Sequence, residues 1–502
     1  MTLASGTFRA AWIGIAAMAL GATPARAETV LRVAAQQMPL YQALPYNPVA
    51  QPQALFVQMI YDPLTVVGEG GIAKPGLASA WTQESANRWV LTLRPGVRFS
   101  NGEAFTSAAV VDALTYLMTP EGQRDSVASQ DIGKTIERVS ARDDLTVELV
   151  TRSPDPILPV HLSFVRVPAP AAWRKAGRSG FATQPIGTGP FAVTSWSPEK
   201  VSFRAVRDSW RAPKVDGIEV NIVTDPVART QAFASGVADI AMGVTPEDRA
   251  TIAAAQGRLA PRPAPNVHFL AFVTTKESPL RDARVRRALN YAVDKSGLID
   301  AFLAGAIEPA SQISHRGAFG FNEALAPYPY DPAKARALLK DAGFPNGFAF
   351  TVVLDTAASG VVDWYQGIAQ NLAAIGVKMT IRPTPVSRIT EYVLKGNWPV
   401  EGFGWTFAGY DSLLGFRFRS CAMQPAYTCD PALMPLIAAA AEAPTEAARR
   451  SATEAALAAE RDAPPGILLW RAVNFDALRN TVSGYEVVND IIAWDKISLA
   501  PR

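Results

Sequence analysis

The segment Arg88–Gly102 reads RWVLTLRPGVRFSNG and carries the clearest local pattern of the chain. Apolar side chains occupy every second position on both sides of a Pro95-Gly96 dipeptide: Trp89, Leu91, Leu93, Val97 and Phe99. A period of two is typical of a strand with one buried face, and Pro-Gly is typical of a turn. The segment therefore predicts a β-hairpin.

Helical patterns surround this segment. Thr106 is the expected N-cap of a helix whose apolar face carries Val110, Leu114 and Leu117. The stretch DARVRRALNYAVDKSGLI, 282–299, predicts one longer helix, with its arginines facing solvent. Its apolar stripe consists of Val285, Leu289, Ala292 and Leu298.

Strands and helices alternate along the rest of the chain. TVLRVAAQ, 29–36, predicts a first strand. Asp331-Pro332 predicts the start of a helix that ends at Gly343. The unit 364–383 predicts a helix, a stop at Gly376 and a strand. This alternation indicates an α/β protein with mixed sheets.

The motif PIGTGPF, 185–191, has the glycine content of a phosphate-binding loop. No lysine follows it, and FAVTSW after it predicts a strand, whereas a phosphate loop opens a helix. We interpret the motif as a close crossing of two chain segments.

Length and composition exclude several classes of protein. The chain has 502 residues, 49% hydrophobic and 19% charged, which is typical of a globular protein with two or three folded units. The formal charge is +3, and it falls to +1 without Arg9 and Arg26. A nearly neutral chain lacks the basic surface that nucleic acid requires, so we expect no nucleic-acid partner.

The N-terminus has the features of a secretory signal. Arg9 precedes the uncharged run 10–21, and Ala25-Arg26-Ala27 is a cleavage sequence of the expected kind. We expect cleavage after Ala27 and export to the periplasm. No cysteine follows the run, so the protein is not expected to be a lipoprotein.

Export places the two cysteines in an oxidising compartment, where disulfides form. Cys421 and Cys429 lie in the mature chain and only eight positions apart, and we expect a disulfide between them. His161, His268 and His315 are widely spaced and no metal-binding motif is present, so neither a metal site nor a cofactor is expected.

Eight phrases, in order along the mature chain, resemble the extracytoplasmic solute-binding proteins of peptide/nickel-type ABC importers. They are IYDPLTVV (60–67), KPGLASAW (74–81), LTLRPGVRFSNGEAFTSAAVV (91–111), PIGTGPFAVTSW (185–196), GVADIAMG (236–243), RVRRALNYAVDKSGLI (284–299), YDPAKARALLKDAGFPNGF (330–348) and LAAIGVKMTI (372–381). Each phrase alone is weakly specific, but together they span nearly the whole mature chain in the family's order.

The resemblance implies the two-lobed periplasmic binding protein fold of the large class, with a hinge between the lobes. Lobe I would comprise 28–47, 187–263 and 477–502, and a subdomain, 48–186, would be inserted into it. Lobe II would comprise 264–476. The chain would cross between the lobes near 262–269 and 468–475, and the ligand would lie in the cleft.

The family's peptide-binding members carry a GWTGD-like pattern whose aspartate receives the ligand's ammonium. Here Gly404-Trp405-Thr406 match, but Phe407 and Ala408 follow, so Ala408 takes the position of the aspartate. The family's dipeptide binders also carry an arginine for the ligand carboxylate. The corresponding stretch, LDTAASGVVDWYQ (354–366), contains no arginine.

The resemblance therefore implies an uncharged, aromatic pocket. Its candidate residues are Trp364, Trp405, Thr406, Phe407, Ala408 and Tyr410. Strand alternation places Trp405 and Phe407 on the face opposite Thr406 and Ala408, and we expect Phe403 to be core.

Charged residues near this pocket leave alternatives open. Asp411, three residues beyond Ala408, replaces the missing aspartate if the loop is shaped differently. Arg417 and Arg419 lie two residues apart and either meet an anionic ligand group or coat the surface beside the cysteines, which we favour. Arg388 is a further candidate.

The predicted function is capture of a peptide-like or other small polar solute, not a free dipeptide, for an inner-membrane ABC permease and its ATPase. A metal chelate, an opine or a sugar conjugate is the alternative ligand. A secreted hydrolase is the rival class, but neither a GxSxG elbow nor an SxxK/KTG pair occurs, so we expect no enzyme. We expect a monomer.

Overall fold

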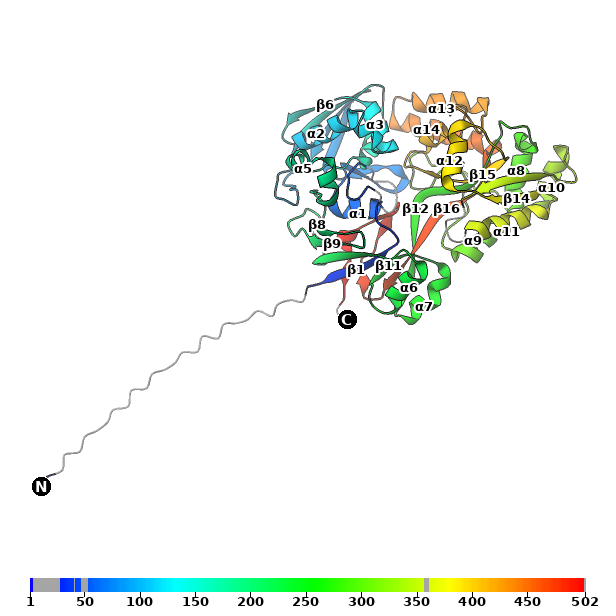
Figure 1. Cartoon of the computed structure of the whole chain (residues 1–502). Helices are drawn as coiled ribbons and strands as arrows, with labels where there is room; N and C mark the ends of the chain where they lie inside the picture. The colour runs from blue at the N-terminus through cyan, green and yellow to red at the C-terminus, as the bar shows by residue number, and fades with distance from the viewer. Residues whose placement is uncertain (3–27, 40, 47–52, 356–360, 501–502) are drawn as a thin grey trace.

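The computed structural model describes residues 1–2, 28–39, 41–46, 53–355 and 361–500. The predicted signal peptide, 1–27, lies almost entirely outside these ranges. The described chain forms two lobes, and the β12 and β16 ribbons run from one lobe to the other (Figure 1). Among the described residues, no helix is long and apolar enough to cross a membrane.

One ten-stranded mixed sheet passes through both lobes, in the order β14-β13-β15-β12-β16-β11-β1-β10-β9-β8. Its strands are β1 Val30–Ala35, β8 Phe191–Trp196, β9 Lys200–Ala205, β10 Gly217–Ile222, β11 Ile240–Val244, β12 Gly257–Phe272, β13 Ala349–Leu354, β14 Lys378–Pro383, β15 Gly402–Ala408 and β16 Gly466–Arg479. β1 pairs in parallel with β10, whereas the long strands β12 and β16 pair antiparallel. The mixed α/β architecture expected from the alternating pattern is therefore confirmed.

A four-stranded sheet, β4-β5-β7-β6, forms a separate layer. Its strands are β4 Ala78–Ser85, β5 Arg88–Leu93, β6 Ile136–Asp143 and β7 Thr146–Thr151. The helices around it are α2 Ser107–Met118, α3 Val127–Thr135, α4 Leu158–His161 and α5 Pro170–Thr183, and the short helix η3 Leu162–Phe164 follows α4. Thr106 holds the N-cap position of α2, but its side chain makes no cap hydrogen bond.

The predicted hairpin over 88–102 is wrong. Pro95-Gly96 does form a turn, with Gly96 at a φ of 74°. However, β5 pairs with β4 on one edge and β7 on the other, so neither edge is open to Val97–Phe99. That segment closes a loop instead, in which Phe105 N donates to Val97 O at 3.0 Å.

The single helix predicted over 282–299 is two helices. They are α8, Ala283–Ala292, and α9, Lys295–Leu303. Asp294 breaks the pattern because its carboxylate accepts the backbone N–H of Gly297 and so caps a new helix.

The expected solvent-facing arginines of this segment are also partly wrong. Arg284 is exposed, but Arg286 is buried. Its guanidinium donates to the carbonyl oxygens of Pro464 at 2.7 Å and Leu280 at 2.9 Å. Sequence patterning treats arginine as a surface residue, whereas backbone carbonyls at the end of a neighbouring element can hold it inside.

The remaining helix and strand predictions are confirmed. Asp331 caps α10, Pro332–Asp341, by accepting the Lys334 N–H, and Gly343 has a φ of 90°. Helix α11, Val361–Ala373, is followed by Gly376 and β14. The other helices are α1 Gln53–Ile60, α6 Pro226–Ala234, α7 Arg249–Ala254, α12 Val386–Lys395, α13 Met434–Ala441 and α14 Glu446–Asp462. Short strands complete the chain: β2 Thr65–Val67, β3 Ala73–Pro75, β17 Val482–Ser483, β18 Val487–Val488, β19 Ile491–Ile492 and β20 Ser498–Leu499.

The PIGTGPF motif forms the predicted crossing. A Cβ on Gly187 would lie 2.0 Å from the carbonyl oxygen of Ile60, and one on Gly189 would lie 2.6 Å from the carbonyl carbon. Only glycine leaves room for the two backbones at this spacing.

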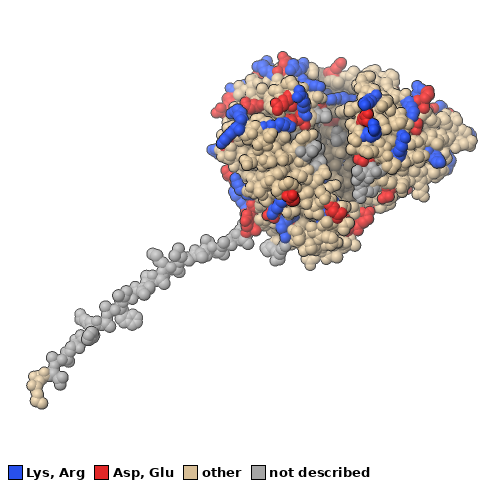
Figure 2. Space-filling view, viewed as in Figure 1, with Lys and Arg blue, Asp and Glu red and all other residues tan. Residues whose placement is uncertain are grey.

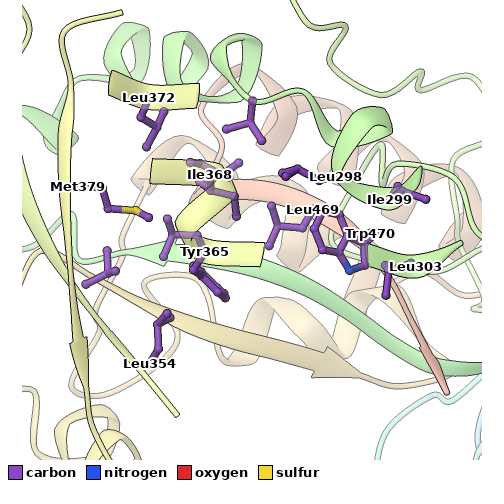
Figure 3. Packing of buried hydrophobic residues seen from close by; sticks show 14 of the residues in the cluster. Leu298, Ile299, Leu303, Leu354, Tyr365, Ile368, Leu372, Met379, Leu469 and Trp470 are labelled. Atoms are coloured by element: carbon purple, nitrogen blue, oxygen red, sulfur yellow. The ribbon is translucent and has the colours of Figure 1, made fainter. Parts of the chain in front are cut away.

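The apolar residues form several cores, and the core around β13 and β14 extends along the sheet to Phe233 of α6 and Ile252 of α7. In the lobe that contains β13 and β14, α9 and α11 pack on the sheet (Figure 3). Another core fills the four-stranded sheet and its helices. A smaller cluster joins the two lobes and consists of Val67, Ile157, Val160, Phe319 and Tyr410.

The predicted disulfide is present between Cys421 and Cys429. It closes the loop that follows the short helix η6, Ser412–Arg417. The structure describes both cysteines, and neither is free.

Candidate ligand-binding site between the lobes

Strand β15 ends where the two lobes meet, and its register with β12 decides which side chains share a face. Thr406 pairs with His268, and Trp405 pairs with Phe269. Because strand neighbours alternate, Trp405 and Phe407 lie on one face and Thr406 on the other. The strand pattern predicted this division.

On the first face, aromatic rings pack against one another. Phe403 is fully buried, and its ring centroid is 4.3 Å from that of Trp398 and 5.7 Å from that of Trp405. Trp405 and Phe407 are half-buried. The core position expected for Phe403 is confirmed.

On the second face, Thr406 is exposed and Trp364 is half-buried. The Trp364 ring lies edge-on to His268 at 5.2 Å and to Trp470 at 5.5 Å. Burial lowers the pKa of His268 to about 4, so its imidazole is neutral at physiological pH. This face therefore offers aromatic surface and uncharged polar groups.

Tyr410, just after β15, contacts the opposite lobe. Its ring stacks on Phe164 with centroids 5.3 Å apart, and its hydroxyl donates to the carbonyl oxygen of Asn489 at 3.3 Å. Ala408 is the last residue of β15 and pairs with Asn266.

Asp411 does not offer a free carboxylate. It is 1% exposed, and its Oδ2 accepts Arg449 Nη2 at 2.7 Å. Its Oδ1 accepts the backbone N–H of Leu413 at 3.0 Å. Burial alone raises its pKa, but His161 and Arg449 hold the pKa below its usual value. The carboxylate is therefore ionised and already occupied.

The three arginines proposed as ligand contacts differ in their exposure and in their partners. Arg417 is exposed and pairs with Asp131 of α3 at 3.0 Å, whereas Arg419 is buried and its Nε donates to Glu460 at 2.7 Å. The favoured expectation that both coat the surface agrees with Arg417 but is wrong for Arg419, because Glu460 holds the Arg419 guanidinium inside. Arg388 pairs with Glu391 on the exposed side of α12.

A cavity of about 40 Å³ lies where the lobes meet. Both lobes contribute to its wall, which includes Gln58, Ser163, Arg166, Pro265, Tyr410 and Asn489. Figure 2 shows the surface hollowed between the lobes, with lysine and arginine side chains scattered over the outer surface on both sides of the hollow.

Sequence reasoning missed three residues at this junction. They are His161, Arg166 and Asn489. Arg166 had a detectable signal, since it interrupts the apolar run FVRVP. His161 and Asn489 had none, because only the fold brings positions so far apart in sequence together.

Among the residues that the structure describes, no group of three or more His, Cys, Asp or Glu side chains is placed to hold a metal ion. The site consists instead of aromatic rings, neutral polar groups and charged side chains.

Two lobes joined along adjacent long strands, with a polar and aromatic site at their junction, define a two-lobed solute-binding protein. Residues 73–418 match the model of the bacterial extracellular solute-binding proteins, family 5. The chain belongs to this family, whose members bind solutes for transporters.

Individual relatives agree with this assignment. The glutathione-binding protein GsiB of Pectobacterium atrosepticum is 32% identical over 301 residues, 58% of this chain and 57% of the relative. The match thus spans a little over half of that relative's length.

Solved structures share the fold across nearly the whole chain. The ABC transporter substrate-binding protein CtaP of Listeria monocytogenes superposes with a TM-score of 0.84 at 19% identity, covering 94% of this chain and 99% of that one. DppA of Helicobacter pylori, in complex with the peptide STSA, has a TM-score of 0.73 at 20% identity, covering 94% and 98%.

Proposed function

We propose that this protein is the periplasmic solute-binding component of an ABC importer. It captures a peptide-like or other small polar organic solute between its lobes and delivers it to an inner-membrane permease with its ATPase. The observation that carries the proposal is the junction itself: a family-5 chain in which aromatic and polar side chains from both lobes meet beside two strands that continue from one lobe into the other.

The lobes are proposed as follows. Lobe I comprises 28–47, 187–263 and 477–502, with 48–186 inserted, and lobe II comprises 264–476. β12 and β16 pair over most of their length, with register shifts between Pro263 and Phe269. Irregular pairing there supports bending at this point, and ligand closes the cleft by favouring the closed form.

The proposed solute lacks a free α-ammonium at the family's aspartate position. Ala408 replaces that aspartate, and the Asp411 carboxylate is already bound by Arg449. Trp364 would supply aromatic surface and Thr406 a polar contact on one face of β15, and Trp405 and Phe407 would supply aromatic surface on the other face. A blocked or modified peptide fits this description, and an opine, a metal chelate or a sugar conjugate is the alternative.

Export by cleavage after Ala27, without a lipid anchor, is part of the proposal, as are a monomeric state and the absence of enzymatic activity. Mature protein purified without refolding should retain its solute, which mass spectrometry of the released small molecules identifies. Incubation with ester and peptide substrates should give no turnover.

Closure is tested by small-angle scattering. Adding the released solute back to stripped protein should decrease the radius of gyration, because the lobes approach each other. An unchanged radius at saturation would contradict the hinge. Finding no retained or bindable small molecule would contradict the proposed function.

A further inference from the structure

Arg166 occupies an unusual position for a charged residue. It lies between Val165 and Val167, both almost fully buried, and is itself only 5% exposed. Its backbone forms a bridge to Pro63, beside β2. The chain therefore holds a guanidinium inside the junction between the lobes.

The guanidinium has no ion-pair partner among the described residues. Its Nη1 donates to the carbonyl oxygen of Ser163, and its Nε has no hydrogen-bond partner. Burial lowers the pKa of Arg166 to about 10, with only partial opposition from Tyr410 and Asp62. The side chain still carries its charge at physiological pH.

The carboxylates in its neighbourhood are occupied by other arginines. Asp62 accepts Arg211 Nε at 2.9 Å, and Asp490 accepts Arg262. Arg211 and Arg262 are thus compensated, whereas Arg166 and the nearby Arg471, which donates to Asn489 Oδ1 and the Ala264 carbonyl, have no ion-pair partner among the described residues. Backbone carbonyls can hold a buried guanidinium, as they do for Arg286. Arg166 differs from Arg286 because it lines a cavity between the lobes, where a ligand can supply the missing charge.

The cavity beside Arg166 is rich in hydrogen-bond donors. Asn489 lines it, and the Nδ2 of that residue is buried without a partner. Gln58 also lines it, and its Oε1 accepts the Ile492 N–H. The Asp490 carboxylate is part of the wall too, but it is paired with Arg262. The buried lining atoms without a partner, Arg166 Nε and Asn489 Nδ2, are both donors, and donors fit an acceptor-only ligand group.

The size of the cavity limits which group of a ligand can enter it. Its volume is only about 40 Å³, so it suits one small group of a solute and not a whole solute. A carboxylate has three heavy atoms and is planar, and it matches the edge of a guanidinium.

We propose that Arg166 binds a carboxylate group of the solute in the cavity between the lobes, closed off on the opposite side by Tyr410 and Pro265. This inference rests on the proposed function and adds the solute class: an organic acid or acidic peptide-like compound. The arginine that binds the solute carboxylate therefore lies in the segment 53–166. It does not lie in the stretch ahead of α11, where the family's dipeptide binders carry their arginine.

The first test needs no ligand. Stripped wild-type protein is compared by thermal unfolding with Arg166→Gln. Because the buried charge is uncompensated, we expect the variant to unfold at the same or a higher temperature. Arg211→Gln, which breaks the pair with Asp62, should unfold at a clearly lower temperature. A drop for Arg166→Gln as large as that for Arg211→Gln would overturn the proposal, because Arg166 would then be a structural residue.

The second test measures binding by calorimetry with N-acetylated dipeptides and with the C-terminal amides of those dipeptides. The acids should bind the wild type and lose about 30-fold or more in affinity in Arg166→Gln, with partial retention in Arg166→Lys. The amides should bind the wild type more weakly and change little in the variant. Arg281→Gln, an exposed arginine, is the control and should bind like the wild type.

The outcomes separate the two claims. Equal affinities of the variant and the wild type for the acids, or equal losses for acids and amides, would overturn the role of Arg166 and leave the binding function standing. If the wild type binds no member of the panel, the solute released from native protein is analysed for a carboxylate. A retained solute without an acidic group would overturn the inference, and no retained solute at all would overturn the proposed function.

Discussion

His161 Nε2 lies 3.8 Å from Asp411 Oδ2, and this contact joins α4 to the segment that follows β15. On its other side, His161 Nδ1 is 2.8 Å from Asp155 Oδ2. One imidazole is therefore placed between carboxylates from the two lobes. Although burial by itself lowers the pKa of His161, Asp155 and Asp411 raise it to about 10.

This arrangement predicts a pH-dependent stability. A histidine whose pKa is higher in the folded protein stabilises it fully below pH 6.5, and the stabilisation is lost as pH rises toward 10. We expect the free energy of unfolding to decrease over this range by on the order of 5 kcal/mol more in the wild type than in His161→Gln. Urea unfolding at several pH values measures the difference.

His315 provides the matched control. Burial lowers its pKa to about 3, so it stays neutral over the same pH range. His315→Gln should change stability equally at every pH tested. Parallel pH profiles for the wild type and His161→Gln would show that His161 is not charged in the folded protein.

Asp411→Asn should be strongly destabilising. The substitution leaves Arg449, with a side chain 8% exposed, and His161 without their shared carboxylate. Removing one partner of a buried pair costs about 3 kcal/mol or more. Asp131→Asn removes an exposed partner of Arg417 and should cost less than about 1 kcal/mol. Similar losses for the two variants in urea unfolding would contradict the burial argument.

Unmodified dipeptides should bind poorly. An enclosed ammonium without a carboxylate keeps an uncompensated charge, and even about 3 kcal/mol corresponds to a roughly 100-fold loss of affinity. Calorimetric titration with free and N-acetylated dipeptides measures this directly. Tight binding of a free dipeptide that Asp411→Asn abolishes at a temperature where the variant is still folded would identify Asp411 as the anchor, and tight binding insensitive to that change would refute the charge argument.

The disulfide should contribute to stability through its short loop. A bridge that spans eight positions stabilises the folded chain by about 2–3 kcal/mol on the chain-entropy model. The double variant Cys421→Ser/Cys429→Ser should therefore unfold at a lower urea concentration. Titration of denatured, unreduced mature protein should find essentially no thiol, and two titratable thiols would refute the bridge.

Gly415→Ala should destabilise the segment before the disulfide. A Cβ there would lie 1.8 Å from Arg419 Nη1 and 2.9 Å from the Phe407 ring. Since Arg419 is fixed by Glu460, the clash moves a buried ion pair, and we expect a loss of about 2 kcal/mol. Gly180→Ala, in α5, meets only the Ala176 Cβ at 3.3 Å and should be near neutral. Equal stability of the two variants would contradict the packing.

Much of the local structure was determined by the sequence alone. Asp331-Pro332 and Gly343 bound α10 because capping and left-handed backbone are local properties. Gly187 and Gly189 predicted that two backbone segments cross closely, because no other residue fits at these positions. The resemblance of eight sequence phrases to the family then predicted that these elements form a two-lobed binding protein.

Pairing and charge were decided only by the tertiary structure. Val97–Phe99 has the alternation of a strand, but β5 had no free edge to receive it. Arg419 and Arg286 resemble surface residues, but Glu460 and the Pro464 carbonyl hold them inside. A partner from a distant part of the chain is invisible to local pattern, and the energy of a charge depends on that partner.

For the candidate site too, the sequence determined some features and only the tertiary structure decided others. Strand alternation placed Trp405 and Thr406 on opposite faces of β15, because the period of a strand is fixed by its backbone. That Asp411 is occupied by Arg449, whereas no described carboxylate pairs with Arg166, depends on contacts between segments far apart in sequence. The charge interactions in the cleft involve residues of both lobes. They form only when folding brings the two walls of the cleft together.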